Sequence, residues 1–217
     1  MMMNNRLNTA FQSIWYNTEL PIEIIDILER DASQLLDDKI KTSEVNTFDE
    51  HGIVKKVRNS KNAWISTNHW IGGFLWHYIE KANRENFLYD LRNLDNETIQ
   101  YTVYNEGDYY GWHNDGGLTT LYKPQLIGNS TDGVGVDFVN QNKELVRKLS
   151  FSLQLSNPDD YEGGELELVD ETGEHYLAPK QRGCLILFDS RTRHQVLKVT
   201  KGTRKSLVGW VLGPRWR

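Results

Sequence analysis

Residues 148–189, KLSFSLQLSNPDDYEGGELELVDETGEHYLAPKQRGCLILFD, contain the pattern that decides the fold. Short alternating or continuous apolar runs such as KLSFSLQLS, GELELVD and GCLILFD are typical of β-strands. The segments between them, NPDDYEGG, DETGE and PKQRG, are rich in residues that form turns. Because no helical segment separates these runs, the stretch predicts a sandwich or jelly roll rather than a βαβ fold.

The strand pattern continues on both sides of this stretch. Further runs of the same kind are TIQYTVYN, HYLAP, HQVLKVT and SLVGWVLG, so about seven short strands are expected from residue 97 onward. The segment 117–142 is long and rich in Gly, Asn, Asp, Ser and Thr. A long segment of this composition inside a compact domain predicts a lid or a binding loop, and the alternative is a disordered excursion.

Two helices are expected before the strands. Residues 21–38, PIEIIDILERDASQLLDD, repeat apolar residues at helical spacing, and Pro21 suits the first helical position. A second helix is expected over residues 68–84, although the Gly72–Gly73 pair lowers its helix propensity. The chain therefore predicts a mainly β protein with N-terminal helices (α+β). Residues 1–96 are expected to form a region of helices and strands that packs on a core of residues 97–217, with both parts forming one structural unit.

Composition excludes several classes of protein. The 217 residues carry a formal net charge of −5, so overall charge does not favour nucleic acid as a partner. A single cysteine, Cys184, excludes an intramolecular disulfide and a zinc site built from several cysteines. No run of apolar residues is long enough to span a bilayer, and the N-terminal residues lack the apolar core of a signal peptide. A cytoplasmic protein with no membrane partner is expected.

A candidate metal site begins in YNEGDYYGWHND, residues 104–115. If His113 and Asp115 lay on one strand, their side chains would point to the same face and could bind one ion. A His-x-Asp pair alone is weak evidence, because chance polar residues in a loop would look the same. A third ligand from a distant strand would make the site specific.

His194 is the candidate for that third ligand, because it follows a turn between two apolar runs in GCLILFDSRTRHQVLKV. The other histidines lie before the strand-rich region or after a turn that is expected to be exposed to solvent: His51, His69, His77 and His175. Two histidines and one carboxylate form the facial triad of non-haem Fe(II) oxygenases. Zinc is the alternative metal, but the HExxH motif of zinc hydrolases is absent from the sequence.

Arg204 follows His194 by an even number of residues, so both could face one interior if the chain turns at Gly202. A buried arginine is costly unless it meets an anion, and its planar guanidinium matches a carboxylate. Together with the triad, Arg204 predicts a pocket for a small dicarboxylate that also chelates the metal. The alternative is a surface arginine in a basic C-terminal segment.

These motifs resemble the 2-oxoglutarate- and Fe(II)-dependent dioxygenases, and most closely their prolyl 4-hydroxylase-like branch. The resemblance rests on YNEGDYYGWHND, then LSFSLQLSNPDDYEGGELEL, then GCLILFDSRTRHQVLKVTKGTRKSLVGW, in the family's order. Upstream, VRNSKNAWIS at residues 57–66 is similar to the Arg-x-Ser stretch that precedes this domain in relatives. The resemblance implies a double-stranded β-helix (jelly roll) core over about residues 97–213.

The resemblance also implies roles for individual residues. His113, Asp115 and His194 take the positions of the iron ligands. Arg204 takes the position of the basic residue that binds the distal carboxylate of 2-oxoglutarate, and Tyr104 that of a tyrosine which often hydrogen-bonds the same carboxylate.

Two further aromatic residues, Tyr110 and Trp210, match positions that line the cofactor and substrate pocket. For both, plain core packing remains the alternative explanation.

The implied reaction is hydroxylation of a C–H bond with O₂ as oxidant, releasing succinate and CO₂, with ascorbate expected as an accessory reductant. The resemblance favours a prolyl residue in a peptide or protein as substrate. The same chemistry on another side chain, a free amino acid or a nucleobase remains open. So do a catalytically inactive jelly-roll binding module and a zinc-dependent enzyme of the same architecture.

Overall fold

The structure is a computed structural model that describes residues 14–17, 20–36, 41–48, 54–95, 98–117, 145–170 and 172–216. The sequence predicts that the segment 117–142 is a lid. Of this segment only residue 117 is described, and the rest lies outside the described residues.

Helices and strands follow one another in this order along the chain: β1 (Ile14–Asn17), α1 (Ile22–Leu36), β2 (Lys41–Phe48), β3 (Val54–Ser66), α2 (Trp70–Ala82), the π-helical turn η1 (Asn83–Phe87), β4 (Asn93–Leu94), β5 (Thr98–Asn105), β6 (Tyr109–His113), β7 (Leu145–Gln154), the 3-10 turn η4 (Pro158–Asp160), β8 (Tyr161–Gly163), β9 (Leu166–Val169), β10 (His175–Leu177), β11 (Leu185–Asp189), β12 (His194–Val196) and β13 (Val199–Pro214).

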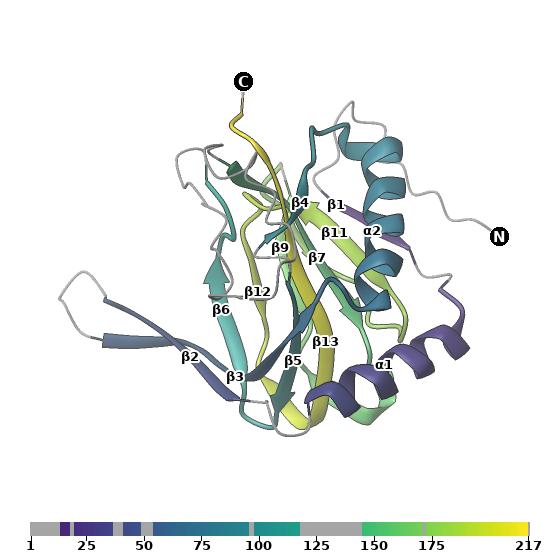
Figure 1. The fold of residues 1–217 in the computed structure, drawn as a ribbon. Helices are drawn as coiled ribbons and strands as arrows, with labels where there is room; N and C mark the ends of the chain where they lie inside the picture. The colour runs from purple at the N-terminus through teal and green to yellow at the C-terminus, as the bar shows by residue number, and fades with distance from the viewer. Residues whose placement is uncertain are drawn as a thin grey trace, which may run out of the picture.

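The described strands pair in the order β1-β11-β7-β13-β5-β3-β6-β12-β9-β10, with β2 beside β3 and with β4 and β8 beside β13. Each of the pairs is antiparallel, as expected for strands joined by turns. Figure 1 shows α1 and α2 on one side of the sheet, near β7 and β11, with β6 on the opposite side of the molecule. The predicted class, mainly β with N-terminal helices, is confirmed.

Alternation along the central strands separates two apolar layers. On β11, Leu185 and Leu187 belong to the cluster that includes the helices, whereas Ile186 and Phe188 belong to a second cluster on the other face. This is the two-residue period of a strand that is buried on both faces. The helices cover one face of the sheet, and the curved interior of the sheet is the other.

The inner face of β13 is unusually polar for a buried surface. Leu207 and Val211 pack in the helix-facing cluster, whereas Arg204, Val208 and Trp210 line a pocket on the opposite face. The neighbouring strands β5 and β7 continue this pattern, because their buried polar residues alternate with apolar ones. Since buried polar groups need partners, this face is suited to a polar ligand.

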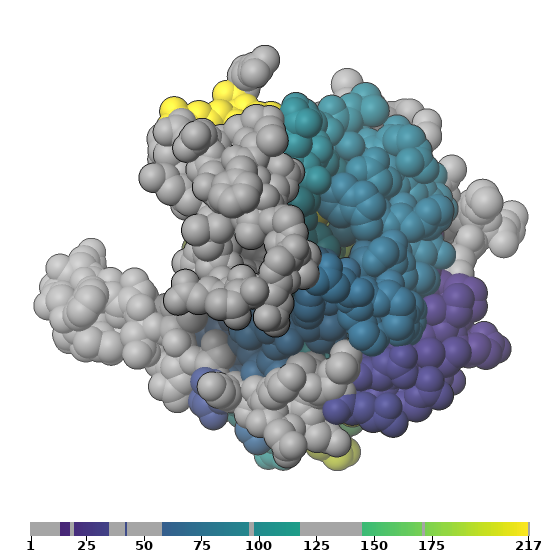
Figure 2. Space-filling view, in the orientation of Figure 1, coloured from purple at the N-terminus to yellow at the C-terminus, as the bar shows by residue number. Residues whose placement is uncertain are grey.

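Both predicted helices are confirmed, with bounds one or two residues shorter than expected. Ile25 and Leu28 of α1 are fully buried against the sheet, and Leu75 of α2 is fully buried as well. Gly72 lies within α2 because a Cβ there would come 2.4 Å from the carbonyl oxygen of Thr67, so close packing explains this weak helix former. In the space-filling view, α1 and the β3–α2 segment lie against each other at the surface (Figure 2).

One expectation about strands needs correction. HQVLKVT is not one strand: β12 ends at Val196, and β13 begins at Val199 and runs through SLVGWVLG. The left-handed backbone of Gly202 (φ +75°) lies within β13, where a Cβ would meet the carbonyl oxygen of Asp160. The N-terminal part contributes strands as well as helices, and β3 is inserted between β5 and β6. The division at residues 96 and 97 stays a prediction.

Within the part of the chain that the structure describes, none of the helices has the length and apolar character needed to cross a bilayer.

Candidate functional site

Two histidines from neighbouring strands meet at the rim of the inner face. His113 is the last residue of β6 and His194 the first of β12, and the two are paired in the strand register. Their ring centroids are 4.1 Å apart. Antiparallel pairing therefore places two imidazoles side by side although they are far apart in the sequence.

The backbone selects the tautomer of both rings. His113 Nδ1 lies 2.8 Å from the carbonyl oxygen of Gly111, and His194 Nδ1 lies 2.9 Å from that of Thr192. A carbonyl can only accept, so each Nδ1 carries the proton and donates it. In the neutral form of each ring, the Nε2 atom is left with its lone pair toward the site, which is the arrangement of a metal-binding histidine. Without a metal ion, the protonated form of each ring can instead donate from Nε2 to the Asp115 carboxylate.

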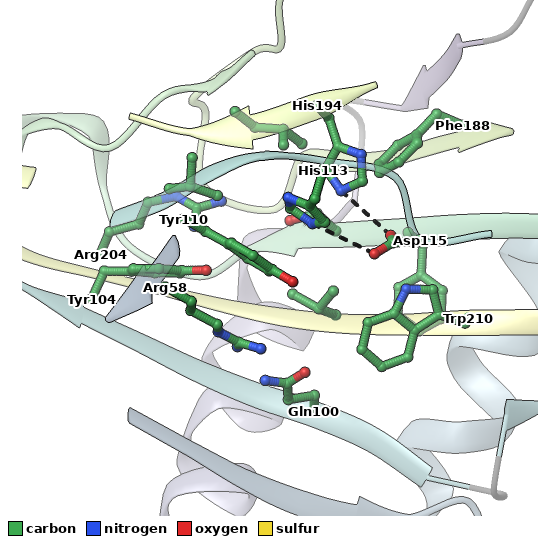
Figure 3. Close-up of a pocket in the computed structure, with 15 residues that line it drawn as sticks. Arg58, Gln100, Tyr104, Tyr110, His113, Asp115, Phe188, His194, Arg204 and Trp210 are labelled. Carbon is green, nitrogen blue, oxygen red and sulfur yellow. Dashed lines mark ion pairs between the residues drawn. The ribbon is translucent and has the colours of Figure 1, made fainter. Parts of the chain in front are cut away.

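Asp115 completes the cluster, but it does not lie on the strand of His113 as the His-x-Asp argument assumed. β6 ends at His113, and Asp115 is placed instead by two backbone hydrogen bonds, from Asp115 N and Gly116 N to the carbonyl oxygen of Ser190, at 3.0 and 2.9 Å. Its carboxylate oxygens lie 3.5 Å from His113 Nε2 and 3.4 Å from His194 Nε2 (Figure 3).

The three candidate ligand atoms lie within 4.8 Å of one another. Burial on its own raises the pKa of the Asp115 carboxyl, but the charge of His194 and hydrogen bonds from both histidines hold this pKa well below its usual value. Burial lowers the pKa of His194, and the Asp115 carboxylate outweighs it and raises that pKa. The donor set of two imidazole nitrogens and one carboxylate fits a divalent metal ion such as Fe(II).

The cluster lies at one side of a pocket that is partly open to solvent. Two aromatic rings hold the imidazoles in place. Tyr110 stacks on His113, with centroids 3.6 Å apart and planes at 13°, and Phe188 contacts His194 edge-on at 4.7 Å. Burial raises the pKa of Tyr110 to about 12, so its hydroxyl keeps its proton. The expectation that Tyr110 lines the pocket agrees with this geometry.

Arg204 lies deep in the same pocket, with only 2% of its surface exposed. Its Nη2 donates to Gln154 Oε1 at 3.0 Å, and its guanidinium lies 5.5 Å from the ring of Tyr104. Burial raises the pKa of Tyr104, so a neutral hydroxyl stands beside a cation. The sequence placed Arg204 and Tyr104 in one pocket, and the structure brings them together there.

Trp210 also lines the pocket, on the side of Asp115 (Figure 3). The guanidinium of Arg147 lies 4.0 Å from its ring, and Trp64 contacts it with ring centroids 6.3 Å apart. Arg147 Nη1 also donates to the backbone carbonyl of Asp115 at 3.2 Å. The environment of the carboxylate is therefore fixed by residues of β7, β13 and β3.

Two pocket residues, Arg58 on β3 and Gln100 on β5, were missed from the sequence. The Arg-x-Ser stretch at residues 57–66 was the available signal, because it contains Arg58 and Ser60. Nothing in the local pattern indicated that β3 would join the wall of the pocket. That placement results from pairing of β3 with both β5 and β6.

Several buried polar atoms of the inner face have no hydrogen-bond partner among the described residues. They include Gln100 Nε2, Thr102 Oγ1, Ser206 Oγ and Trp210 Nε1. Thr102 and Ser206 are register partners on β5 and β13, and Gln154, which holds Arg204, pairs with Ser206 on the other side. Unpaired buried polar groups are rare in folded proteins, and in a pocket a water molecule or a ligand can supply the missing partner. The region beside Arg204 thus fits a polar group such as a carboxylate.

Comparison with known proteins agrees with this site. Residues 99–212, more than half of the chain, match the 2OG-Fe(II) oxygenase superfamily. The chain belongs to this superfamily, whose members are named for 2-oxoglutarate and Fe(II), and the family predicted from the motifs is confirmed. His113, Asp115, His194 and Arg204 all fall within the matched residues, whereas Arg58 precedes them.

Individual relatives are PKHD-type hydroxylases. The chain is 38% identical over 89 residues to one from Parvibaculum lavamentivorans, covering 40% of each chain. It is 32% identical over 139 residues to one from Xylella fastidiosa strain M12, covering 63% of this chain and 54% of the relative. The matches thus span about half of the length of these relatives.

Among solved structures, a prolyl-4-hydroxylase from Pseudomonas putida superposes with a TM-score of 0.62 at 17% identity, covering 95% of this chain and 94% of the other. At this identity the likeness concerns the fold. It confirms the expected double-stranded β-helix (jelly-roll) core with N-terminal helices.

Proposed function

We propose that the protein is an Fe(II)- and 2-oxoglutarate-dependent dioxygenase that hydroxylates a C–H bond, with succinate and CO₂ as co-products. The observation that carries this proposal is the convergence of His113, Asp115 and His194 at one end of a pocket whose other end holds the buried cation of Arg204. A metal cluster facing a carboxylate-binding group fits a dicarboxylate that chelates the metal.

His113, Asp115 and His194 would hold Fe(II) through Nε2, a carboxylate oxygen and Nε2. Three protein ligands leave open positions for a cosubstrate and O₂. The bound iron and 2-oxoglutarate supply the oxidation chemistry, and the chain supplies position and environment. Hydrogen bonds to the backbone carbonyls of Gly111 and Thr192 keep both imidazoles in the ligating tautomer before the metal arrives.

Arg204 would bind the distal carboxylate of 2-oxoglutarate, with Tyr104 as a neutral donor beside it. Gln154 accepts one hydrogen bond from the guanidinium, so the other N–H donors of Arg204 remain for the carboxylate. Thr102 and Ser206, whose buried hydroxyls have no partner among the described residues, lie on the same two strands as Tyr104 and Arg204. Tyr110 and Phe188 cover the imidazoles and exclude water from the metal-binding side.

For the substrate, we propose a prolyl residue in a peptide or protein. The support is indirect: the fold is shared with a prolyl-4-hydroxylase, and the relatives named above are PKHD-type hydroxylases. Aromatic residues at the pocket, Tyr110 and Trp210, suit a pyrrolidine ring. Ascorbate is proposed as an accessory reductant that keeps the iron in its divalent state.

Succinate release with Fe(II), 2-oxoglutarate, ascorbate and O₂ tests the proposal, with each candidate peptide then weighed by mass spectrometry. Peptide-stimulated succinate together with a gain of one oxygen on proline is the expected result. Succinate release that no peptide stimulates would retain the dioxygenase and remove the peptidyl-prolyl substrate. Absence of succinate from protein shown to contain iron would contradict the enzyme and favour a binding module.

A further inference from the structure

The pocket contains a second buried guanidinium, that of Arg58, which the proposed roles do not use. Arg58 is 9% exposed and reaches the pocket from β3. Its Nε donates to Ser60 Oγ at 2.8 Å and its Nη2 to Asn62 Oδ1 at 3.0 Å. Both partners are neutral, so among the described contacts no carboxylate balances this charge.

Tyr110 lies next to Arg58 on the side of the metal cluster. The guanidinium lies 4.9 Å from the centroid of the Tyr110 ring, and that ring stacks on His113. A group held by Arg58 at the edge of Tyr110 would therefore lie close to the metal ligands. This geometry places Arg58 within reach of a substrate rather than only at the outer surface.

Two further donors of the same pocket have no acceptor among the described residues. Gln100 is 1% exposed, and its Nε2 lies buried without a partner, as does Nε1 of Trp210. In Figure 3 the amide of Gln100 and the guanidinium of Arg58 point toward one another. Leaving such donors unpaired is costly, so this side of the pocket is suited to an acceptor that the described residues do not supply.

Charge indicates what kind of acceptor this is. Among the described residues that line the pocket, the charged side chains besides the histidines are Asp115, Arg58 and Arg204. A divalent metal ion and the Asp115 carboxylate together carry one positive charge, and the two guanidinium groups raise this total to three positive charges. The dianion of 2-oxoglutarate removes two of these charges. One buried positive charge remains, and a monovalent anion would neutralise it.

We propose that Arg58 and Gln100, with Trp210, form a subsite for a carboxylate of the substrate. The substrate would be an amino acid, or the C-terminal residue of a peptide, that keeps its free carboxylate while a nearby C–H bond faces the metal. This inference rests on the proposed dioxygenase activity, and it favours a free amino acid or a C-terminal residue over an internal prolyl residue as the substrate. Arg58 is then a specificity-determining residue that acts on the substrate, and Arg204 is the residue that acts on 2-oxoglutarate.

The test compares each acid with its own carboxamide, because the pair differs in charge and hardly in shape. Wild-type protein is loaded with Mn(II) and 2-oxoglutarate without O₂, and binding is measured by calorimetry. The probes are the free acids and amides of the common amino acids, starting with L-proline and L-prolinamide, and peptides ending in proline as acid or amide. At least one acid is expected to bind about 10- to 100-fold more tightly than its amide, the effect of one or two charged hydrogen bonds.

Substitutions then assign the preference to the subsite. Arg58→Gln is expected to abolish the preference for the acid and to leave 2-oxoglutarate affinity within about twofold. Gln100→Leu is expected to reduce the preference, and Arg58→Lys to retain part of it, which provides a test if Arg58→Gln does not fold. Arg92→Gln is the matched control, since it removes an exposed arginine that pairs with Asp90.

The outcomes separate this inference from the proposed function. If metal and 2-oxoglutarate bind but no acid binds better than its amide, the carboxylate subsite is wrong and the dioxygenase stands. If Arg58→Gln weakens 2-oxoglutarate as strongly as the acid, Arg58 belongs to the cosubstrate site and the inference is also wrong. If neither metal nor 2-oxoglutarate binds the wild-type protein, both proposals fail.

Discussion

At the residue scale, the candidate metal ligands are prepared by contacts that the chain makes without any metal. Each imidazole of His113 and His194 is oriented by a backbone carbonyl two residues before it. Asp115 is fixed by backbone hydrogen bonds to Ser190. Contacts of this kind, between the ligands and their neighbours, raise the affinity of a metal site because the ligands lose little freedom when the metal binds.

Removing one ligand should abolish metal binding without unfolding the protein. His194→Ala leaves two ligands, so we expect metal affinity to fall by more than the roughly 10- to 100-fold that losing an outer partner costs. His175→Ala is the control, because His175 is exposed and lies outside the cluster. Metal titration measures the loss of affinity, and succinate release measures the loss of activity that follows from it. Binding by His194→Ala as tight as in the control would contradict the ligand assignment.

Arg204 should control affinity for 2-oxoglutarate. Arg204→Gln removes a buried cation that faces the distal carboxylate in our proposal, so we expect the Kd of 2-oxoglutarate to rise about 100-fold, given about 1.5–3 kcal/mol for each charge-assisted hydrogen bond. Arg204→Lys should lose less, because it keeps the charge and loses only the planar fork. Calorimetry on the Mn(II) protein measures this, with exposed Lys201→Gln as control. Unchanged Kd in Arg204→Gln would remove the cosubstrate role.

At the scale of elements, the ion pair of Asp95 and Arg147 connects the end of β4 to β7 and to the metal site. Arg147 donates to Asp95 Oδ2 from Nε at 2.8 Å and from Nη2 at 2.6 Å, and from Nη1 to the carbonyl of Asp115 at 3.2 Å. Asp95 is 4% exposed. One guanidinium therefore joins an element of the N-terminal part to the loop that carries a candidate ligand.

Breaking this pair should weaken both the fold and the site. Asp95→Asn leaves the Arg147 cation largely buried without its carboxylate, so we expect the free energy of unfolding to fall by about 3 kcal/mol. Because Arg147 then holds the Asp115 carbonyl less firmly, metal affinity should fall about 10-fold. Urea denaturation and metal titration measure the two effects. Asp90→Asn, in an exposed pair with Arg92, is the control. Lower stability with unchanged metal affinity would limit the pair to a structural role.

At the scale of the whole molecule, the site joins strands from both parts of the chain, so ligand binding should stabilise all of it. The pocket takes residues from β3, β5, β6, β7, β9, β11, β12 and β13. A ligand that binds only the folded state stabilises by mass action. The melting temperature is therefore a readout of the site that does not depend on turnover.

Metal and 2-oxoglutarate together should raise the melting temperature. At 100 times the Kd, each binding event contributes about 2.7 kcal/mol, and for a chain of this length roughly 2–4 °C accompanies each kcal/mol. We expect a shift of roughly 5–10 °C with Mn(II) alone and a further rise with 2-oxoglutarate. Differential scanning fluorimetry measures it, and a chelator should reverse it. His194→Ala should show neither shift, and a shift in that variant equal to wild type would mean that the ligands bind elsewhere.

The sequence by itself determined the strand and helix pattern and the chemical identity of the candidate site. The alternation of apolar and polar residues in TIQYTVYN predicted β5 over residues 98–105 with the bounds the structure has. His113, Asp115, His194 and Arg204 were identified because few residue combinations suit a metal and a dicarboxylate. These are local properties, since periodicity and residue type are read without knowing which strands pair.

Only the tertiary structure decided which side chains meet. β3 lies between β5 and β6, and that placement brings Arg58 beside Tyr110 and adds a second guanidinium to the pocket. Asp115 reaches the histidines from a loop rather than from a strand face, because Ser190 holds its backbone. Contacts between strands distant in sequence depend on pairing order and register, and the energy of a pairing comes from packing across the whole sheet. The proposed contact of Arg58 and Gln100 with a substrate was therefore visible only once the sheet was assembled.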